Sequence, residues 1–310
     1  MSNLKVESVN ISERKGTIKK PVDMIVLDNS GIKNDAHAGD WNRQVSMLGT
    51  ESIQKFTEET GRKISYGEFA ENITTSGMIL NQTKPLDRFS SAKLMLEITQ
   101  IGKKCHGTSC TIFRETGNCV MPLEGIFCRV VAPGHLKQGD ILEFLPKIYK
   151  ISIITVSDRA SKGIYTDKSG PEALGILEKH FHVQKLPCKI TSVIIPDDSS
   201  RIELEIENSC KNKADIIITT GGTGIGPKDF TADIVRQLIE KEIPGIMEFV
   251  RYKYGSEKPN ALLSRSVAGI KGKTLIYALP GSTHAVREYL EEINKGLIHT
   301  IYMLNGLDLH

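Results

Sequence analysis

A glycine-rich segment in the C-terminal half has the composition of an anion-binding loop. Residues 219–231 read TTGGTGIGPKDFT, and they follow an apolar run and precede a helical pattern. In an open α/β sheet, ligands bind beyond the carboxyl ends of the strands, and glycines there let backbone N–H groups approach an anion closely. The spacing matches neither the dinucleotide-binding GxGxxG motif nor a P-loop. We predict a phosphate cradle, with a simple turn as the alternative, formed by Gly221, Gly222, Thr223 and Gly224.

Carboxylates follow three of the predicted strands in this half. Asp229 stands near the start of a predicted helix, where a carboxylate can cap the helix or bind Mg²⁺. Asp197 follows a second strand, and Ser157 and Asp158 follow a third. Because the carboxyl ends of parallel strands meet at one edge of a sheet, we expect these groups to converge. Asp198 is a candidate cap for the next helix, which leaves Asp197 as the freer carboxylate.

Two further turns offer polar groups to the same site. The segment NALLSRS supplies the hydroxyl of Ser264 and the guanidinium of Arg265. The segment LPGST, with Gly281 and Ser282, ends the last predicted strand on a hydroxyl. The alternative for each turn is that it only begins a helix.

The cysteines of the N-terminal half fall in one stretch. Cys105, Cys110, Cys119 and Cys128 are separated by four, eight and eight residues, whereas zinc sites usually contain close pairs such as CxxC. A zinc or iron-sulfur site is therefore only an alternative. Cys105 stands among two lysines and a histidine, so we expect an exposed, activated thiolate there. Cys128 lies in an apolar run and is interpreted as a small core residue.

A second polar cluster precedes these cysteines. Asp35 and His37 are two residues apart, so on a strand they would share one face. Arg43 follows them and could bind a phosphate. The alternative is a solvated turn in which the aspartate is a cap.

Two different folds are needed to position these groups, and we place the boundary so that the domains are residues 1–147 and 148–310. Ile- and Val-rich runs alternate with amphipathic segments in the second domain, which predicts a doubly wound α/β domain with a largely parallel sheet. The predicted strands are 151–156, 192–195, 215–219 and 274–279, and the predicted helices are 171–181, 200–211, 231–240 and 284–303.

The first domain reads as a mostly antiparallel β barrel. One helix is predicted over residues 50–60, with Thr50 as its cap and Gly61 at its end. The predicted strands are 4–9, 24–27, 94–99, 126–131 and 140–144.

Composition excludes several classes of protein. A chain of 310 residues suggests about two domains at ~100–200 residues each, and no apolar run approaches the ~20 residues of a membrane span. A net charge of +3 without a basic stripe gives no indication of nucleic-acid binding. Six cysteines are too few for a disulfide framework, and the first residues do not resemble a secretory signal, so we expect a cytoplasmic protein.

Six motifs of the second domain resemble those of the molybdopterin adenylyltransferases and related molybdopterin-binding domains. They are SDRASKGIYTDKSG, IIPDD, TTGGTGIGPKDFTAD, EIPG, LLSRSVAGI and ALPGS. The resemblance implies a three-layer α/β domain, usually a homotrimer, that binds molybdopterin and MgATP and joins AMP to the terminal phosphate of molybdopterin. It implies that Asp197 and Asp229 hold Mg²⁺ and that Ser264 and Ser282 donate to phosphate or pterin. Lys228 stands where arginine is frequent in the family.

The first domain resembles the MOSC domain, named after the C-terminal part of molybdenum cofactor sulfurase. The matching motifs are GIKNDAHAG, RQVSML, GEFAENITTSGMIL, ITQIGKKCH and MPLEGIFCRVVAPGHLKQGD. This resemblance implies a β-rich barrel that binds the molybdenum cofactor or carries sulfur, with Cys105 at the position of the functional cysteine. Together the two resemblances predict a protein of molybdenum cofactor biosynthesis, acting with other enzymes of that pathway. The alternatives are a non-catalytic carrier of the pterin and an upstream zinc or iron-sulfur module.

Overall fold

The computed structural model describes residues 3–92, 94–104 and 119–307. It forms two compact units, of which the first contains the described residues up to Lys147 together with Leu307, and the second is Ile148–Gly306. Among the described residues, the helices lack the combined length and apolar character that a bilayer span requires.

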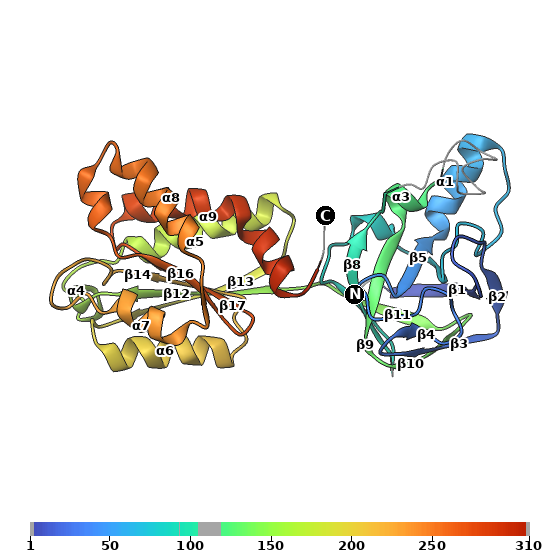
Figure 1. Cartoon of the computed structure of the whole chain (residues 1–310), viewed down its shortest axis with the longest axis horizontal. Helices are drawn as coiled ribbons and strands as arrows, with labels where there is room; N and C mark the ends of the chain where they lie inside the picture. Colours follow the sequence, from blue (N-terminus) through green and yellow to red (C-terminus); the bar gives the residue numbers. More distant parts are fainter. Residues whose placement is uncertain (1–2, 93, 105–118, 308–310) are drawn as a thin grey trace. The chain divides into compact units, whose positions relative to one another are not determined.

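A closed β barrel forms the first unit (Figure 1). Its sheet has eight strands in the order β11-β7-β8-β9-β5-β6-β1-β2, and pairing of β11 with β1 closes the ring and leaves only β2 outside it. The mostly antiparallel barrel is confirmed, with β5 and β6 as its parallel pair. The strands are β1 (Asn3–Ile11), β2 (Lys20–Val22), β5 (Val45–Gly49), β6 (Ile73–Ser76), β7 (Arg88–Ser90), β8 (Met95–Ile101), β9 (Ile126–Ala132) and β11 (Ile141–Leu145).

A small sheet and short helices complete this unit. The sheet has the order β10-β3-β4, and its strands are β3 (Met24–Asp28), β4 (Gly31–Ile32) and β10 (Gly134–Lys137). The helices are α1 (Thr50–Thr60), η1 (Leu80–Gln82) and α3 (Met121–Glu124). Cys128 is fully buried in the barrel core, where burial raises the pKa of its thiol, so its interpretation as a core residue is confirmed.

The predicted helix over residues 50–60 is confirmed as α1, but its predicted cap is wrong. The capping position is Gly49, without a side-chain hydrogen bond, and Thr50 is the first helical residue. The other end is as predicted, because Gly61 adopts φ 69°, a left-handed conformation that glycine accepts without steric cost.

A six-stranded mixed sheet forms the middle layer of the second unit, in the order β13-β12-β14-β17-β16-β15. Strands β13, β12, β14 and β17 are parallel, and β16 and β15 continue the sheet antiparallel. The predicted largely parallel sheet is therefore only partly correct. The strands are β12 (Tyr149–Val156), β13 (Cys188–Ile195), β14 (Ile216–Thr220), β15 (Lys241–Glu242), β16 (Val267–Lys271) and β17 (Thr274–Leu279).

Helices cover both faces of this sheet, which gives three layers (Figure 1). Helices α6 and α7 lie on one face, and α5, α8 and α9 lie on the other. Apolar side chains of β12, β14, α6 and α7 share one buried cluster. The helices are α4 (Asp158–Ser161), α5 (Ser169–Val183), α6 (Ser199–Lys211), α7 (Thr231–Leu238), α8 (Pro244–Gly255), η3 (Pro259–Leu263) and α9 (Thr283–Leu304).

A carboxyl group is fully buried in the barrel unit. The Glu71 side chain accepts hydrogen bonds from the Gly67 N–H (2.6 Å) and the Thr74 hydroxyl (2.9 Å). Burial raises the pKa of Glu71, and these hydrogen bonds only partly oppose the shift. The folded chain therefore retains this proton to a higher pH than the unfolded chain does. Stability consequently falls as pH rises from the ordinary glutamate pKa through the raised one.

We expect Glu71→Gln to remove this component of the pH dependence, which is at most ~1.4 kcal/mol per pH unit for one proton. The variant should be more stable than the parent at alkaline pH, because the amide never has to ionise. Urea unfolding followed by the fluorescence of Trp41, the single tryptophan, reports on this unit. Replacing the exposed Glu13 by Gln should leave the slope unchanged. An unaltered slope in Glu71→Gln would contradict the prediction.

Candidate functional site

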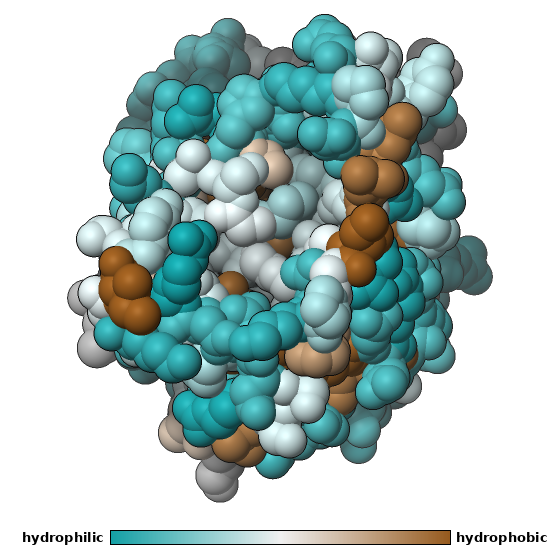
Figure 2. All heavy atoms as spheres, turned by 90° about the vertical axis from the view of Figure 1, so that its left-hand side faces the viewer, coloured by the Kyte–Doolittle hydropathy of each residue, from teal (hydrophilic) through white to brown (hydrophobic). Residues whose placement is uncertain are grey.

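The glycine-rich segment lines a cavity of about 600 Å³ in the second unit. This volume lies within the usual range for small-molecule sites. Figure 2 shows the face of this unit that carries α4, where hydrophilic side chains surround a paler hollow and separate hydrophobic side chains stand near its rim. Eight of the predicted site residues line the cavity, namely Gly221, Gly222, Thr223, Gly224, Asp229, Ser264, Gly281 and Ser282.

We call residues 221–230, between β14 and α7, the glycine loop. Its first two positions have no room for a side chain. Gly221 has φ +99° and Gly222 has φ +64°. A Cβ atom on Gly221 would lie 2.3 Å from the carbonyl oxygen of Val156, at the end of β12, and one on Gly222 would lie 2.3 Å from the Thr231 hydroxyl. The Gly221 N–H donates to the carbonyl of Leu279, at the end of β17. The loop thus lies between the ends of β12 and β17, the two strands that flank β14.

Asp229 stabilises the glycine loop through a hydrogen bond to the loop's own backbone. Its Oδ2 accepts a hydrogen bond from the N–H of Gly226 at 2.7 Å, while its side chain also lines the cavity. The capping position of α7 is Phe230, without a side-chain cap, so the alternative in which Asp229 caps this helix is wrong. One carboxylate oxygen, Oδ1, has no hydrogen bond within the described chain.

Arg265 holds the loop from outside and is not among the residues that line the cavity. Its Nε donates to the carbonyl of Gly224 (2.7 Å), and its Nη2 donates to the carbonyl of Asp229. Its Nη1 forms an ion pair with Asp233 at 2.8 Å. The guanidinium predicted to bind a ligand is therefore engaged by the protein.

The acidic groups after β12 and β13 converge, as expected from the parallel strand order. The Asp158 N–H donates to Asp197 Oδ2 (2.6 Å), and the Asp197 N–H donates to Asp158 Oδ1 (3.2 Å). Lys228 reaches across from the glycine-rich segment to Asp158 Oδ2 at 2.9 Å. Its hydrogen bond lowers the pKa of Asp158, and the same bond raises the pKa of Lys228. Asp158, Asp197 and Lys228 do not line the cavity, and no described contact joins Asp197 to Asp229.

One hydroxyl group and one carboxyl group in this region cap helices. Ser157 accepts from the Ala160 N–H at the start of α4, and Asp198 accepts from the Arg201 N–H at the start of α6. The alternative that Asp198 caps a helix is thus confirmed. Asp197 accepts one hydrogen bond through Oδ2, from the Asp158 N–H.

The two predicted serine donors lie on the cavity wall. Ser264 Oγ is 2.6 Å from Ser266 Oγ, and Ser282 Oγ accepts from the Ala285 N–H at the start of α9. Because Ser282 acts there only as an acceptor, its hydroxyl proton stays available to a ligand. Gly281 packs against the loop, since a Cβ atom on it would lie 3.2 Å from Gly221 Cα.

A charged cluster on the same cavity was missed by the sequence analysis. Lys258 donates to Glu288 Oε1 at 2.7 Å and contacts His284 Nε2, and His284 Nε2 lies 3.0 Å from the same carboxylate. All three residues line the cavity. They come from a loop and from two turns of α9, so no local motif could have indicated them.

In the first unit, a buried ion pair organises the predicted Asp35 and His37 cluster. Lys19 Nζ lies 2.6 Å and 2.8 Å from the two oxygens of Asp35, and both side chains are almost fully buried. Burial acts to raise the pKa of Asp35, but hydrogen bonds with His37 and Lys19 hold it below its usual range. Burial lowers the pKa of Lys19. The expectation that Asp35 and His37 share a strand face is wrong, because both lie in the turn region after β4.

Of the remaining predicted residues of this unit, the structure describes Arg43 but not Cys105 or Cys110. Arg43 lies 5.0 Å above the ring of Trp41, whose Nε1 donates to the His37 carbonyl. Cys105 and Cys110 lie outside the described residues. Within the described ranges, no group of three or more histidine, cysteine and acidic side chains is arranged to hold a metal ion.

Family models match both halves of the chain. The model described as "Probable molybdopterin binding domain" matches residues 152–300, and the MOSC domain model matches residues 34–143.

Curated relatives match the second half. Molybdopterin adenylyltransferase of Helicobacter pylori (strain J99) is 33% identical over 157 residues, which are 50% of this chain and 88% of that protein. The enzyme of the same name from Pyrococcus furiosus is 34% identical over 50% of this chain and 91% of its own length. Gephyrin of Dictyostelium discoideum is 35% identical over 50% of this chain but only 22% of its own length. The chain therefore belongs to the molybdopterin-binding domain family that includes the molybdopterin adenylyltransferases, and it carries a MOSC domain in its N-terminal half.

Proposed function

We propose that this protein acts in molybdenum cofactor biosynthesis and that its second domain, residues 148–310, adenylylates molybdopterin with MgATP. The observation that carries the proposal is the single cavity shared by the glycine loop, Asp229, Ser264 and Ser282. Relatives that this chain matches over most of their length are named for the same activity. In the reaction, the terminal phosphate of molybdopterin attacks the α-phosphorus of ATP, a new P–O bond forms, and pyrophosphate leaves.

The residues of the cavity suit a transfer between two anions. Such a transfer needs positioning and neutralisation of charge more than it needs a protein nucleophile. The backbone N–H groups of the loop from Gly222 to Gly224 provide fixed donors to a phosphate, and Ser264 and Ser282 add hydroxyl donors on the facing turns. Since the loop is held in place by Arg265 and by the strand ends, these donors require little reorganisation during the reaction.

The carboxylates near the loop fit a magnesium ion. Carboxylate oxygens are preferred ligands of Mg²⁺, and both Asp229 and Asp197 retain an Oδ1 oxygen that accepts no hydrogen bond from the described chain. Bound Mg²⁺ supplies neutralisation of phosphate charge. We assign Asp229, which lines the cavity, as the first ligand and Asp197 as the second. The backbone N–H of Asp158 orients the Asp197 carboxylate by donating to its Oδ2, and Lys228 pairs with the Asp158 side chain.

For the first domain, residues 1–147, we propose binding of the finished cofactor or handling of its sulfur through Cys105. Asp35 and Lys19 fix the position of His37, and Arg43 adds a positive charge beside Trp41. The proposal extends to a cytoplasmic homotrimer formed through the second domain, working with other enzymes of the pathway.

A non-catalytic pterin carrier is the competing function. The observation in its favour is that Asp197 does not line the cavity, so only one of the two proposed metal ligands does. The two functions differ in a single measurement, the release of pyrophosphate after MgATP is added to the pterin complex.

We expect Asp229→Asn to lower the rate of adenylyl transfer on the order of a hundredfold, because the amide keeps the loop contact but loses the charge that binds the metal. Chromatographic detection of AMP-molybdopterin and pyrophosphate measures this effect. Asp198→Asn is the matched control, since asparagine caps a helix as well as aspartate does. Full activity in Asp229→Asn would refute the assignment, whereas molybdopterin binding without pyrophosphate release in the parent chain would establish the carrier.

We expect Gly222→Ala to abolish detectable binding of molybdopterin in isothermal titration, because the new methyl group collides with Thr231 and displaces the loop. Gly272→Ala provides the control. Gly272 has a similar φ of +58°, and a Cβ atom there meets nothing within 4 Å, so that variant bears the same backbone strain without touching the cavity. Equal affinities in the two variants would show that the loop does not bind the pterin.

A further inference from the structure

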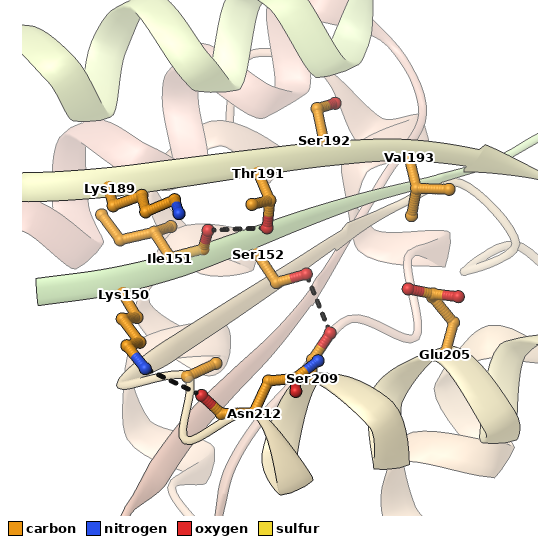
Figure 3. Close-up of a pocket in the computed structure, with 11 residues that line it drawn as sticks. Lys150, Ile151, Ser152, Lys189, Thr191, Ser192, Val193, Glu205, Ser209 and Asn212 are labelled. Atoms are coloured by element: carbon orange, nitrogen blue, oxygen red, sulfur yellow. Dashed lines mark hydrogen bonds between the residues drawn. The ribbon is translucent and has the colours of Figure 1, made fainter.

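We propose that a second cavity in the second unit binds a small phosphorylated polyol, such as a sugar phosphate. The cavity lies between β12, β13 and α6 and has a volume of about 460 Å³ (Figure 3). Two of its lining residues, Lys150 and Lys189, stand near the beginnings of β12 and β13. It therefore opens near the amino ends of these strands, whereas the glycine loop follows a carboxyl end. The inference does not depend on the proposed function.

Two lysines form the cationic end of this cavity. Lys150 and Lys189 are direct partners in the parallel register of β12 and β13, so they project on the same face from strands ~4.8 Å apart. Lys150 donates to the carbonyl of Asn212, and among the described residues no ion pair is formed by either lysine. Like charges in directly opposite positions destabilise a sheet. An anion held between the two ammonium groups converts this repulsion into attraction.

Hydroxyl groups form the floor. Ser152 and Ser209 are each only 6% exposed, and their Oγ atoms are 2.9 Å apart. Their mutual hydrogen bond uses one of two hydroxyl protons, so one donor remains for a ligand. Thr191 is the register partner of Ser152 and donates to the Ile151 carbonyl, which leaves its oxygen as an acceptor. In Figure 3 these three side chains lie between the lysines and Glu205.

Glu205 forms the opposite, anionic end. It precedes Ser209 by one turn of α6, lines the cavity and makes no ion pair with the described residues. A free phosphate would occupy only a small part of the cavity and would leave this carboxylate without a role. A ligand with phosphate at one end and hydroxyl groups at the other satisfies both ends, because a carboxylate readily accepts hydrogen bonds from hydroxyl groups. Along β13, the distance from Lys189 to Val193 is ~13 Å, which is long enough for such a ligand.

Protection of the sheet edge explains only part of this arrangement. Lysines on edge strands hinder pairing with other chains, and Lys189 is on the edge strand β13. Lys150, however, is on β12, which is paired on both sides. Edge protection therefore does not explain Lys150, and its hydrogen bond to the Asn212 carbonyl uses only one of the three ammonium donors, which leaves the others for a ligand.

Isothermal titration of the full chain with ribose 5-phosphate, inorganic phosphate and ribose tests the proposal. We expect saturable binding of ribose 5-phosphate, with lower affinity for inorganic phosphate and none for ribose. Lys150→Gln and Lys189→Gln should each weaken binding of ribose 5-phosphate by about tenfold, the loss of one charge-assisted hydrogen bond. Glu205→Gln should weaken binding of ribose 5-phosphate and leave that of inorganic phosphate unchanged.

Lys179→Gln on α5 is the matched control, because it removes the same charge from the opposite face of the sheet. A thermal melt of each variant checks that it is folded. Absence of saturable binding would overturn the proposal, and so would an equal loss of affinity in Lys179→Gln. Equal affinities for ribose 5-phosphate and inorganic phosphate would overturn the assignment to a phosphorylated polyol.

Discussion

The second unit depends on the close approach of three strand ends around Gly221. Its backbone lies against the last carbonyl of β12, donates to the last carbonyl of β17 and touches Gly281. A side chain at this position would collide with Val156, so the approach requires glycine. Because β12, β14 and β17 are parallel neighbours, their carboxyl ends meet at this edge, and the glycine loop and Ser282 directly follow two of these ends. The cavity is a consequence of strand order as much as of its own side chains.

The barrel unit handles buried charge in two contrasting ways. Asp35 is buried but compensated by Lys19, so it remains ionised and holds the turn that carries His37. Glu71 is buried with weaker compensation, so burial favours its neutral form. A buried carboxylate whose partner is removed is costly, whereas a neutral carboxyl needs only hydrogen-bond partners. The Asp35 cluster is consequently intolerant of losing either member, which suits a position that must present a histidine reproducibly.

Features of this fold with a local signal are predictable from the sequence, whereas features set by long-range contacts are not. The helix α1, the four parallel strands and the glycine loop on a cavity are marked by periodicity, apolar runs and glycine spacing within short windows. Strand β16 was missed because its sequence, VAGIK, is short and follows a polar turn. Lys19 was not predicted as a site residue because it is 16 residues from Asp35 in the sequence. Lys258 was not predicted because its partners are on α9. Such pairs are set by tertiary packing, which one sequence does not display.

Arg265 has a consequence for the dynamics of the glycine loop. It stands just before β16 and binds two carbonyls of the loop and a carboxylate of α7. Opening of the loop would therefore break two of these hydrogen bonds at once, those to the carbonyls of Gly224 and Asp229. Proteins open locally in cooperative units whose members exchange their amide hydrogens together. Because Arg265 joins the loop to the first turn of α7 and stands at the start of β16, we expect the amides of these three segments to exchange their hydrogens together.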